Sequence, residues 1–240
     1  MKKVVFLIPA YNEEEIIEKN VIRLHEYLSK NLKKYDWKIL VSDNCSKDKT
    51  LEIAKKLSKK YKRVKYRHLD KKPLGYSIKT NWLAEEADIY SYMDADMSTD
   101  ITHIPELLKG IEDGYDIVMG SRTSDKSKTS RSANRNIMSK VLIGIIRLFF
   151  STKFSDYQCG FKAINRKVRD NIIPKMKCVE VGFISTEMIV VASKKGYKIK
   201  EIPVRWSDHR VSKSPIFKGI TDALKNIIKI KRDLVKGRYD

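Results

Sequence analysis

The chain has 240 residues, of which 42% are hydrophobic and 33% are charged, and this balance excludes an intrinsically disordered protein. Its 50 Lys and Arg residues outnumber its 30 Asp and Glu residues, and the excess is concentrated in residues 121–240, which hold 28 basic and 10 acidic side chains. The second half is therefore expected to bind an anionic partner such as a membrane surface, a phosphorylated substrate or a polyanion.

The three cysteines, Cys45, Cys159 and Cys178, show no zinc-ligand spacing and give no disulfide framework, which fits a reducing cytosol. The apolar stretch 4–10 is short and contains Pro9, so we interpret it as a buried first strand and not as a targeting segment. No run approaches the roughly 20 apolar residues that span a bilayer. We therefore expect a cytosolic protein that contacts a membrane without crossing it.

Short apolar runs alternate with longer amphipathic segments through the first 120 residues. We expect strands at 4–8, 38–42, 64–68, 88–93 and 116–119. Helices should follow at 13–28, 50–60, 77–87 and 101–112, the first one capped by Asn12 and carrying acidic residues in its positive first turn. This alternation predicts an α/β fold with a doubly wound, mostly parallel sheet and flanking helices.

The regular alternation ends after Gly120. Residues 121–132 are polar and predict a mobile loop, and an amphipathic segment follows at 134–150. Further along we expect a helix near 185–195, a hairpin-like pair of strands around 198–204 and 205–209, and a basic amphipathic helix from about 214 to 236. We interpret residues 1–212 as one domain and residues 213–240 as a helical extension of it.

Two aspartates, Asp94 and Asp96, follow the fourth expected strand. In an open α/β sheet, ligands bind at the edge formed by the carboxyl ends of the strands. Neighbouring carboxylates repel each other unless a cation joins them, and their hard oxygen ligands suit Mg²⁺ or Mn²⁺. The alternative is an acidic turn in which Asp96 or Ser98 caps the next helix.

Residues 43–50 follow the second expected strand and should lie beside Asp94 at the same edge. Asp43 could accept hydrogen bonds from a nucleotide base or a ribose, whereas Asp48 is expected to cap the helix that begins at Thr50. Gly75 precedes the third helix, where it would either let the backbone approach a ligand or merely form the turn.

These motifs occur in one order along the chain: PAYNE at 9–13, DNCSKDKT at 43–50, LG at 74–75 and MDAD at 93–96. Together they resemble the nucleotide-sugar half of the family 2 inverting glycosyltransferases, which have the Rossmann-like GT-A fold. In the second half GSR at 120–122, DYQCGFK at 156–162, GYKIKEIPV at 196–204 and SKS at 212–214 are similar to the polyprenyl-phosphate (dolichyl-phosphate) glycosyltransferases. The QCGFK string is closer to the glucosyl branch than to the mannosyl branch. The resemblance covers about residues 3–215.

The resemblance implies a GT-A catalytic domain at 1–212, in which 1–120 bind the nucleotide sugar and 121–212 bind the acceptor. Independently of the resemblance, the basic amphipathic pattern predicts a membrane-proximal helix at 213–240. The resemblance also implies a nucleotide-sugar pocket made of Pro9, Tyr11, Glu13, Asp43, Gly75, Asp94 and Ala95. Asp94 and Asp96 would hold Mg²⁺ or Mn²⁺, with Asp96 as the main ligand. The acceptor phosphate would be bound by Arg122, Arg135, Ser139 and Lys162, and the two arginines would also take part in catalysis.

Two positions depart from the family's pattern. Ser98 stands where the mannosyl enzymes often carry Gln, and a hydroxyl is a weaker metal ligand, so a third protein ligand is in question. Cys45 replaces the usual glycine, so its loop is expected to have a different shape.

The implied reaction is the inverting transfer of a hexose from UDP-glucose or GDP-mannose to a polyprenyl phosphate at the cytosolic face of a membrane. A phosphate acceptor is already anionic at neutral pH, so it needs positioning by cations more than it needs a base. Transfer to a sugar hydroxyl is the alternative, and it would need a catalytic base, for which Glu187 is the candidate. A nucleic-acid-binding protein is an alternative from another class, but the basic residues are not interleaved with aromatic ones and no known binding motif is present.

Two segments are candidates for membrane contact. Residues 141–150 form an apolar stripe between Lys140 and Lys153, and residues 216–238 form a basic amphipathic helix of the kind that lies in a membrane interface. Either stripe could instead pack on the domain. We expect such packing for the first part of 134–150 and membrane contact for 216–238.

Overall fold

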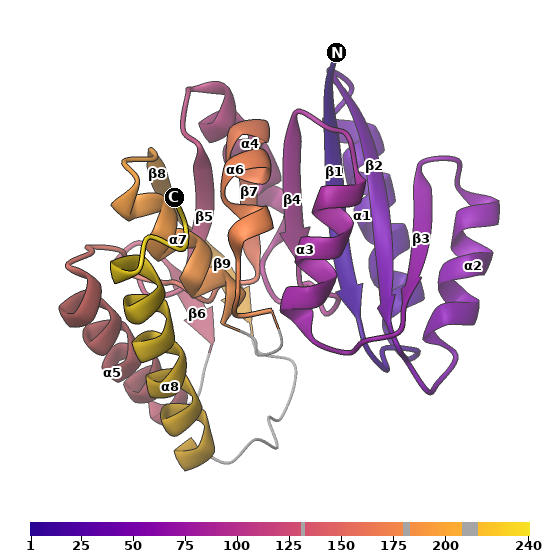
Figure 1. Ribbon diagram of the computed structural model, residues 1–240. Coiled ribbons are helices and arrows are strands. Elements are labelled where there is room, and N and C mark those ends of the chain that lie inside the picture. The colour runs from indigo at the N-terminus through magenta and orange to yellow at the C-terminus, as the bar shows by residue number, and fades with distance from the viewer. Residues whose placement is uncertain (131–132, 180–182, 208–215) are drawn as a thin grey trace.

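Seven strands form a central twisted sheet in the computed structural model, which describes residues 1–130, 133–179, 183–207 and 216–240 (Figure 1). The side chains of residues 130, 133–136 and 216–220 lie outside that description. The strands are β1 Lys2–Ala10, β2 Tyr35–Asn44, β3 Val64–Leu69, β4 Ile89–Met93, β5 Ile117–Ser121, β7 Phe161–Asn165 and β8 Ile199–Pro203. Their order is β3-β2-β1-β4-β7-β5-β8, and only β7 runs antiparallel to its neighbours. The predicted α/β fold with a mostly parallel sheet is therefore confirmed.

Helices cover both faces of this sheet. They are α1 Ile17–Asn31, α2 Thr50–Lys60, α3 Leu74–Ala84, α4 Ile104–Glu112, α5 Ala133–Phe150, α6 Arg166–Asn171, α7 Ile184–Lys194 and α8 Ile216–Val235, with short 3₁₀ turns at Ile101–His103 and Ile173–Lys175. Val4, Phe6 and Ile8 of β1 pack with α1, α2 and α4, whereas Val5 and Leu7 pack with α3, α6 and α7. Because successive side chains of a strand point to opposite faces, burial on both sides explains the uninterrupted apolar run of β1.

The expected hairpin near residue 204 is wrong. β8 adds to the central sheet beside β5, and the next strand, β9 Arg205–Ser207, pairs instead with β6 Lys128–Ser130 in a second, two-stranded sheet. The chain changes sheet at Val204, whose backbone N–H donates to the carbonyl of Ser121. Strand β6 lies within the segment expected to be a mobile loop, because pairing with β9 supplies backbone partners that its polar sequence does not reveal.

Helices α5 and α8 pack against each other and against α7 in a third apolar cluster (Figure 1). Ile227 and Ile230 of α8 are fully buried there, so the apolar stripe of this helix faces the protein core and the expectation that it faces a membrane is wrong for these residues. Helix α5 packs on the domain through Leu142, Ile143 and Ile146, so the packing expected for its first part is confirmed only in part, because Ile137 and Val141 are exposed, as is Leu148 further along. Within the described residues, none of the helices is both long and apolar enough to cross a membrane.

Candidate functional site

The carboxyl ends of β1, β2, β4 and β5 come together at one edge of the sheet (Figure 1). Asn12, Cys45 and Met97 lie in the loops after β1, β2 and β4, and each has a positive φ, of 54°, 61° and 49° respectively. This conformation costs a residue with a Cβ atom about 1–2 kcal/mol, and such strain concentrates at functional sites. The positive φ of Cys45 also explains why glycine suits that position in related sequences.

The loops after β1 and β2 are bound to each other by hydrogen bonds. Asn12 donates its N–H to Ser46 Oγ at 3.0 Å and accepts the N–H of Lys47 on its own side-chain oxygen at 2.8 Å. Glu13 donates its N–H to Thr50 Oγ1 at 2.8 Å. Asn12 therefore does not cap α1, which begins at Ile17, because its side chain is engaged with the neighbouring loop. These bonds fix the half-buried predicted nucleotide residues Pro9, Tyr11 and Glu13 beside the end of β2.

Asp43, at the end of β2, is fully buried and only half satisfied. Its Oδ2 lies 2.6 Å from Nδ1 of His68, the residue beside it in the register of β3. Its Oδ1 has no hydrogen-bond partner among the described residues. Buried carboxylate oxygens are almost always hydrogen-bonded, so this atom is a free acceptor for an N–H or O–H group of a ligand. Asp48, which was expected to cap the helix that begins at Thr50, accepts the N–H of Thr50 on its Oδ1 at 2.9 Å.

Asp94 and Asp96 lie in a tight turn directly after β4, and both are half-buried. The N–H of Met97 donates to the carbonyl of Asp94 at 3.0 Å, and the N–H of Ser98 donates to Asp96 Oδ1 at 3.0 Å. Asn20 of α1 donates to the carbonyl of Ala95 at 2.8 Å. The turn is thus held in place by its own backbone and by α1.

The turn also suits the divalent cation predicted for it. Among the described residues there is no group of three or more Cys, His, Asp and Glu side chains that could enclose a metal. Mg²⁺ is commonly held by one or two carboxylates together with substrate phosphates, so the pair Asp94 and Asp96 matches a metal that arrives with a diphosphate. Asp96 also accepts Ser98 N–H, so a turn-stabilising role and a ligand role are compatible in one side chain.

Arg122, the first residue after β5, forms a two-pronged ion pair with Asp156. Its Nε lies 2.6 Å from Oδ2 and its Nη2 lies 2.9 Å from Oδ1, and its backbone N–H donates to the same carboxylate at 3.1 Å. Burial would raise the pKa of Asp156, but the charge and hydrogen bonds of Arg122 outweigh burial and lower this pKa overall. The pair therefore stays charged and fixes the guanidinium in one orientation.

A small cavity beside this ion pair combines charged and apolar groups. Arg122 and Ser139 line it together with Asp156, Tyr157, Gln158 and three apolar side chains of α5, namely Leu142, Ile143 and Ile146. Two of the predicted acceptor residues, Arg122 and Ser139, are thus brought together at an apolar helix. Arg135, the third predicted acceptor residue, lies near the start of α5, but its side chain is outside the described part of the structure.

The structure does not bring Lys162 to this cavity. Its side chain is fully buried on β7, and its Nζ donates to the carbonyl of Cys159. Burial lowers the pKa of Lys162, while Cys159, Asp156 and Asp94 act in the opposite direction. The prediction that Lys162 binds an acceptor phosphate is therefore wrong as a direct contact, because the ammonium group lies beneath the site.

Glu187 is also not available as a base. It is fully buried in α7, where it accepts the N–H groups of Lys177 and Cys178 at 2.8 Å each and the hydroxyl of Tyr239 at 2.6 Å. These contacts hold the backbone of Lys177 and Cys178 close to Tyr239, near the C-terminus of the chain. The role that the hydroxyl-acceptor alternative required of Glu187 is therefore contradicted by its surroundings.

Gly75 faces the backbone of Val179, the residue after Cys178, and not an open cleft. A Cβ atom at this position would lie 2.6 Å from the carbonyl oxygen of Val179, and the N–H of Tyr76 donates to that oxygen at 3.0 Å. The glycine is needed for close packing of two backbone segments, a reason that its position in the sequence did not reveal.

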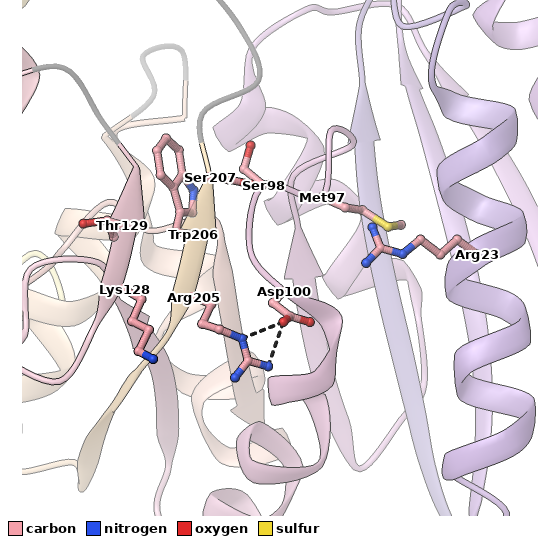
Figure 2. Close-up of a pocket in the computed structure, with 9 residues that line it drawn as sticks. All are labelled: Arg23, Met97, Ser98, Asp100, Lys128, Thr129, Arg205, Trp206 and Ser207. Atoms are coloured by element: carbon pink, nitrogen blue, oxygen red, sulfur yellow. Dashed lines mark hydrogen bonds and ion pairs between the residues drawn. The ribbon is translucent and has the colours of Figure 1, made fainter.

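A larger pocket of about 490 Å³ lies between α1 and the small sheet, and Met97 and Ser98, the residues directly after the Asp94–Asp96 turn, help to line it (Figure 2). It is lined by Arg23, Met97, Ser98, Asp100, Lys128, Thr129, Arg205, Trp206 and Ser207. Arg205 Nε donates to Asp100 Oδ2 at 2.8 Å within it. The ring of Trp206 lies 5.7 Å from the guanidinium carbon of Arg122, so this tryptophan connects the pocket with the ion pair.

Sequence reasoning missed the contributions of His68, Asp156 and Trp206. His68 could have been found only by knowing its register with Asp43, and Trp206 only by knowing that β9 pairs beside the Asp94–Asp96 turn. Asp156 stands in the DYQCGFK string quoted above, but its partner Arg122 is 34 residues away in the sequence, so the string itself does not reveal the ion pair.

Comparison with known proteins gives one family match. The family model described as "Glycosyl transferase family 2" matches residues 5–173. Glycosyltransferase AglD of Haloferax volcanii is 31% identical over 224 residues, which cover 91% of this chain and 35% of that protein. Dolichyl-phosphate beta-glucosyltransferase ALG5A of Trichomonas vaginalis is 29% identical over 242 residues, which cover 96% of this chain and 71% of that protein. The chain thus spans well under two thirds of the length of AglD.

Solved structures also resemble the chain. Glucosyl-3-phosphoglycerate synthase from Mycobacterium tuberculosis, crystallised with Mn²⁺, UDP and phosphoglyceric acid, superposes with a TM-score of 0.69 over 99% of this chain and 78% of that one, at 14% identity. At this level of identity, the likeness shows a shared fold.

Proposed function

Because the chain belongs to glycosyl transferase family 2, we propose that it transfers a hexose from a nucleotide sugar to the phosphate of a polyprenyl lipid, such as the dolichyl phosphate named for ALG5A. The observation that carries this proposal is the meeting of Arg122 and Ser139 with apolar side chains of α5, around a cavity of about 10 Å³ that has to widen before a phosphate can enter. A cationic and hydroxyl-bearing end suits a phosphate headgroup, and an apolar wall suits the first isoprene units.

The nucleotide end of the site is at Asp43. Its buried and unpartnered Oδ1 accepts an N–H of the base, a group that both uracil and guanine offer. Tyr11 and Glu13 lie beside it at the end of β1. UDP and GDP therefore both satisfy this acceptor, and the glucosyl-like QCGFK string together with the name of ALG5A favours UDP-glucose as the donor.

The diphosphate end of the site is at Asp94 and Asp96. Asp94 and Asp96 would hold a Mg²⁺ or Mn²⁺ ion, which when bound would supply positive charge to the leaving nucleoside diphosphate. The solved glucosyl-3-phosphoglycerate synthase contains Mn²⁺ and UDP together, which supports a divalent ion in this fold. This chain's own contribution is a turn that backbone hydrogen bonds at Asp94 hold in place and in which the N–H of Ser98 orients the Asp96 carboxylate.

The acceptor phosphate needs orientation and no proton removal. Arg122 holds it in line with the anomeric carbon, and Asp156 prevents the guanidinium from rotating away. A phosphate oxygen forms the new bond to the anomeric carbon as the bond to the leaving diphosphate breaks, so the configuration inverts. No general base takes part, which agrees with the buried, fully engaged state of Glu187.

Contact with a membrane follows from the position of the lipid-binding wall. Helices α5 and α8 are neighbours, and between them they expose Ile137, Val141, Leu148, Ile228 and Val235. Basic side chains of the same helices, including Lys140 and Arg232, are exposed and suit anionic headgroups. The protein therefore binds peripherally, with α5 towards the lipid and at the cytosolic face, where nucleotide sugars are available.

A donor panel tests the proposal. The full chain is incubated with radiolabelled UDP-glucose or GDP-mannose, a short polyprenyl phosphate and Mg²⁺ or Mn²⁺, and then again with a chelator. We expect one donor to give a lipid-linked hexose, with loss of the product on chelation. Absence of product with every donor, together with salt-sensitive binding of generic duplex DNA, would contradict the proposal and favour the nucleic-acid alternative.

A further inference from the structure

The glycine of the QCGFK string lies directly against Asp94. Strands β4 and β7 pair so that Met93 faces Phe161, and the N–H of Asp94 donates to the carbonyl of Gly160 at 3.2 Å. A Cβ atom added to Gly160 would lie 2.1 Å from Asp94 Oδ2 and 2.3 Å from its Cγ. Real Cβ atoms essentially never come this close to another heavy atom, so the carboxylate of Asp94 occupies the space where a side chain of residue 160 would be.

The preceding residues of the same segment hold Arg122. Both carboxylate oxygens of Asp156 accept from the guanidinium of Arg122. Its Oδ1 also accepts the backbone N–H groups of Gln158 and Cys159 at 3.0 and 3.1 Å. We call residues 156–160 the clamp turn. The clamp turn thus contacts the predicted acceptor arginine at its first residue and the predicted metal carboxylate at its last.

The clamp turn is itself anchored to the central sheet. Glu201 of β8 accepts the N–H of Ser155 at 2.8 Å and the N–H of Asp156 at 3.1 Å. At the other end the turn runs directly into β7, between β4 and β5. Because both ends are fixed to strands, the turn cannot easily shift to make room for an added side chain, and Asp94 would have to move instead.

Lys162 belongs to the same buried group. It follows the clamp turn by two residues, and both Asp94 and Asp156 favour its charged form although burial opposes that form. Its fully buried Nζ donates to the carbonyl of Cys159, the residue before Gly160 in the clamp turn.

We propose that Gly160 is a positioning residue for Asp94, and that the clamp turn sets the spacing between the metal-binding carboxylate and the acceptor-binding arginine. This inference deepens the proposed function and rests on it for the identity of the ligands. A donor and an acceptor must be held at one distance and angle for a single displacement, and one short turn that contacts both groups fixes that geometry. The absence of a side chain at residue 160 is what lets the carboxylate keep its place.

The test is a double-mutant cycle on the full chain with Gly160→Ala, Asp94→Ala and the two combined. Binding of UDP with Mn²⁺ is measured by isothermal titration calorimetry, and stability by the thermal midpoint Tm. We expect Gly160→Ala alone to weaken Mn²⁺-dependent UDP binding at least about tenfold and to lower the Tm by about 5 °C, because its Cβ displaces the Asp94 carboxylate. In the Asp94→Ala background, Gly160→Ala should lower neither UDP binding nor the Tm further. The added Cβ would no longer meet Cγ, Oδ1 and Oδ2 of Asp94, which this background lacks.

A matched control is Gly144→Ala in α5, where an added Cβ would meet nothing within 4 Å. This control should leave UDP binding unchanged. The inference is overturned if Gly160→Ala binds Mn²⁺ and UDP like the wild type, or if it lowers the Tm equally in both backgrounds. If Gly160→Ala alone fails to fold, recovery of folding in the double variant supports the inference and failure of both overturns it.

This experiment distinguishes a failure of the proposed function from a failure of the inference that Gly160 positions Asp94. A wild-type chain that binds no nucleotide sugar would contradict the proposed function. The coupling between residues 94 and 160 in the Tm would then still decide whether Gly160 positions Asp94, because that measurement needs no ligand.

Discussion

The two halves of the chain position their polar groups in different ways. In the first half the side chains of the site leave the ends of adjacent parallel strands, and their loops are tied by hydrogen bonds such as that between Asn12 and Lys47. In the second half, buried side chains pair with partners that are distant in sequence, as in the ion pair of Arg122 with Asp156 and the hydrogen bond from the Tyr239 hydroxyl to Glu187. The first arrangement leaves an acceptor open for a ligand at Asp43, whereas in the second both carboxylate oxygens of Asp156 and of Glu187 accept hydrogen bonds.

This difference has an energetic consequence. Removing one group of a hydrogen-bonded surface loop costs little because water replaces the partner, whereas removing one partner of a buried pair leaves an uncompensated charge. We therefore expect substitutions in the second half to act first on stability, and substitutions at the edge of the first half to act first on ligand binding.

The largest effect is expected for Asp156→Asn. It leaves the Arg122 guanidinium buried without a counter-charge, and we expect the free energy of unfolding to fall by about 3–5 kcal/mol in urea titrations followed by circular dichroism. Asp113→Asn is the control, because its ion pair with Lys109 is exposed to solvent and should contribute little to the free energy of unfolding. Equal losses in the two variants would remove the proposed contrast between buried and exposed pairs.

A smaller loss is expected for Glu187→Gln. The amide keeps one acceptor oxygen for three donors, so the free energy of unfolding should fall by about 1–3 kcal/mol, while the folded protein transfers hexose at close to the wild-type rate. Tyr239→Phe, which removes one donor and leaves the carboxylate, should lose less. Unchanged stability with abolished transfer would instead identify Glu187 as a base.

The pH dependence of stability should reveal the same ion pair. The pKa of Asp156 is lower in the folded protein than the ordinary value of about 3.9, so the stabilisation is fully present above that value and is lost as the pH falls through the lower folded pKa. Unfolding titrations between pH 2 and pH 7 should therefore show the difference between wild type and Asp156→Asn shrinking only below about pH 4. A difference that stays constant down to the lowest pH would show that the carboxylate does not contribute through its charge.

The smallest effect, and one of opposite sign, is expected at Cys45. Replacing it by glycine relieves a left-handed backbone conformation and should raise the free energy of unfolding by about 0.5–1 kcal/mol, with UDP binding unchanged. Ser151→Gly, at another positive φ and outside the candidate site, should give a similar gain. A loss of stability in Cys45→Gly would mean that the thiol makes contacts that outweigh the strain.

Local sequence pattern was enough to predict the strands and helices of the first half and the edge at which Asp43, Asp94 and Asp96 meet. Each of these residues follows a strand whose apolar run marks its end, so local information places them. The resemblance to known glycosyltransferases added Arg122 and Ser139. These two residues come together only through the packing of α5 against the end of β5.

The remaining features depend on contacts that no local pattern contains. The antiparallel insertion of β7 places Gly160 under Asp94 and Lys162 in the interior, and sequence alone placed that lysine at the acceptor phosphate. The same holds for Glu187, whose burial follows from the return of Tyr239 at the end of the chain. An ionisable residue in a recognised motif therefore does not reveal whether it faces a substrate or supports a residue that does.

The most direct test of the central claim compares two acceptors of equal chain length, a polyprenyl phosphate and the corresponding polyprenol, with the active nucleotide sugar and Mg²⁺. If Arg122 and Ser139 bind an anionic headgroup and no base is present, labelled hexose should appear on the phosphate and not on the alcohol. Arg122→Ala, measured at a temperature where circular dichroism shows it folded, should give no product. Equal transfer to the polyprenol, or undiminished transfer by Arg122→Ala, would contradict the claim that this site delivers a hexose to a lipid phosphate.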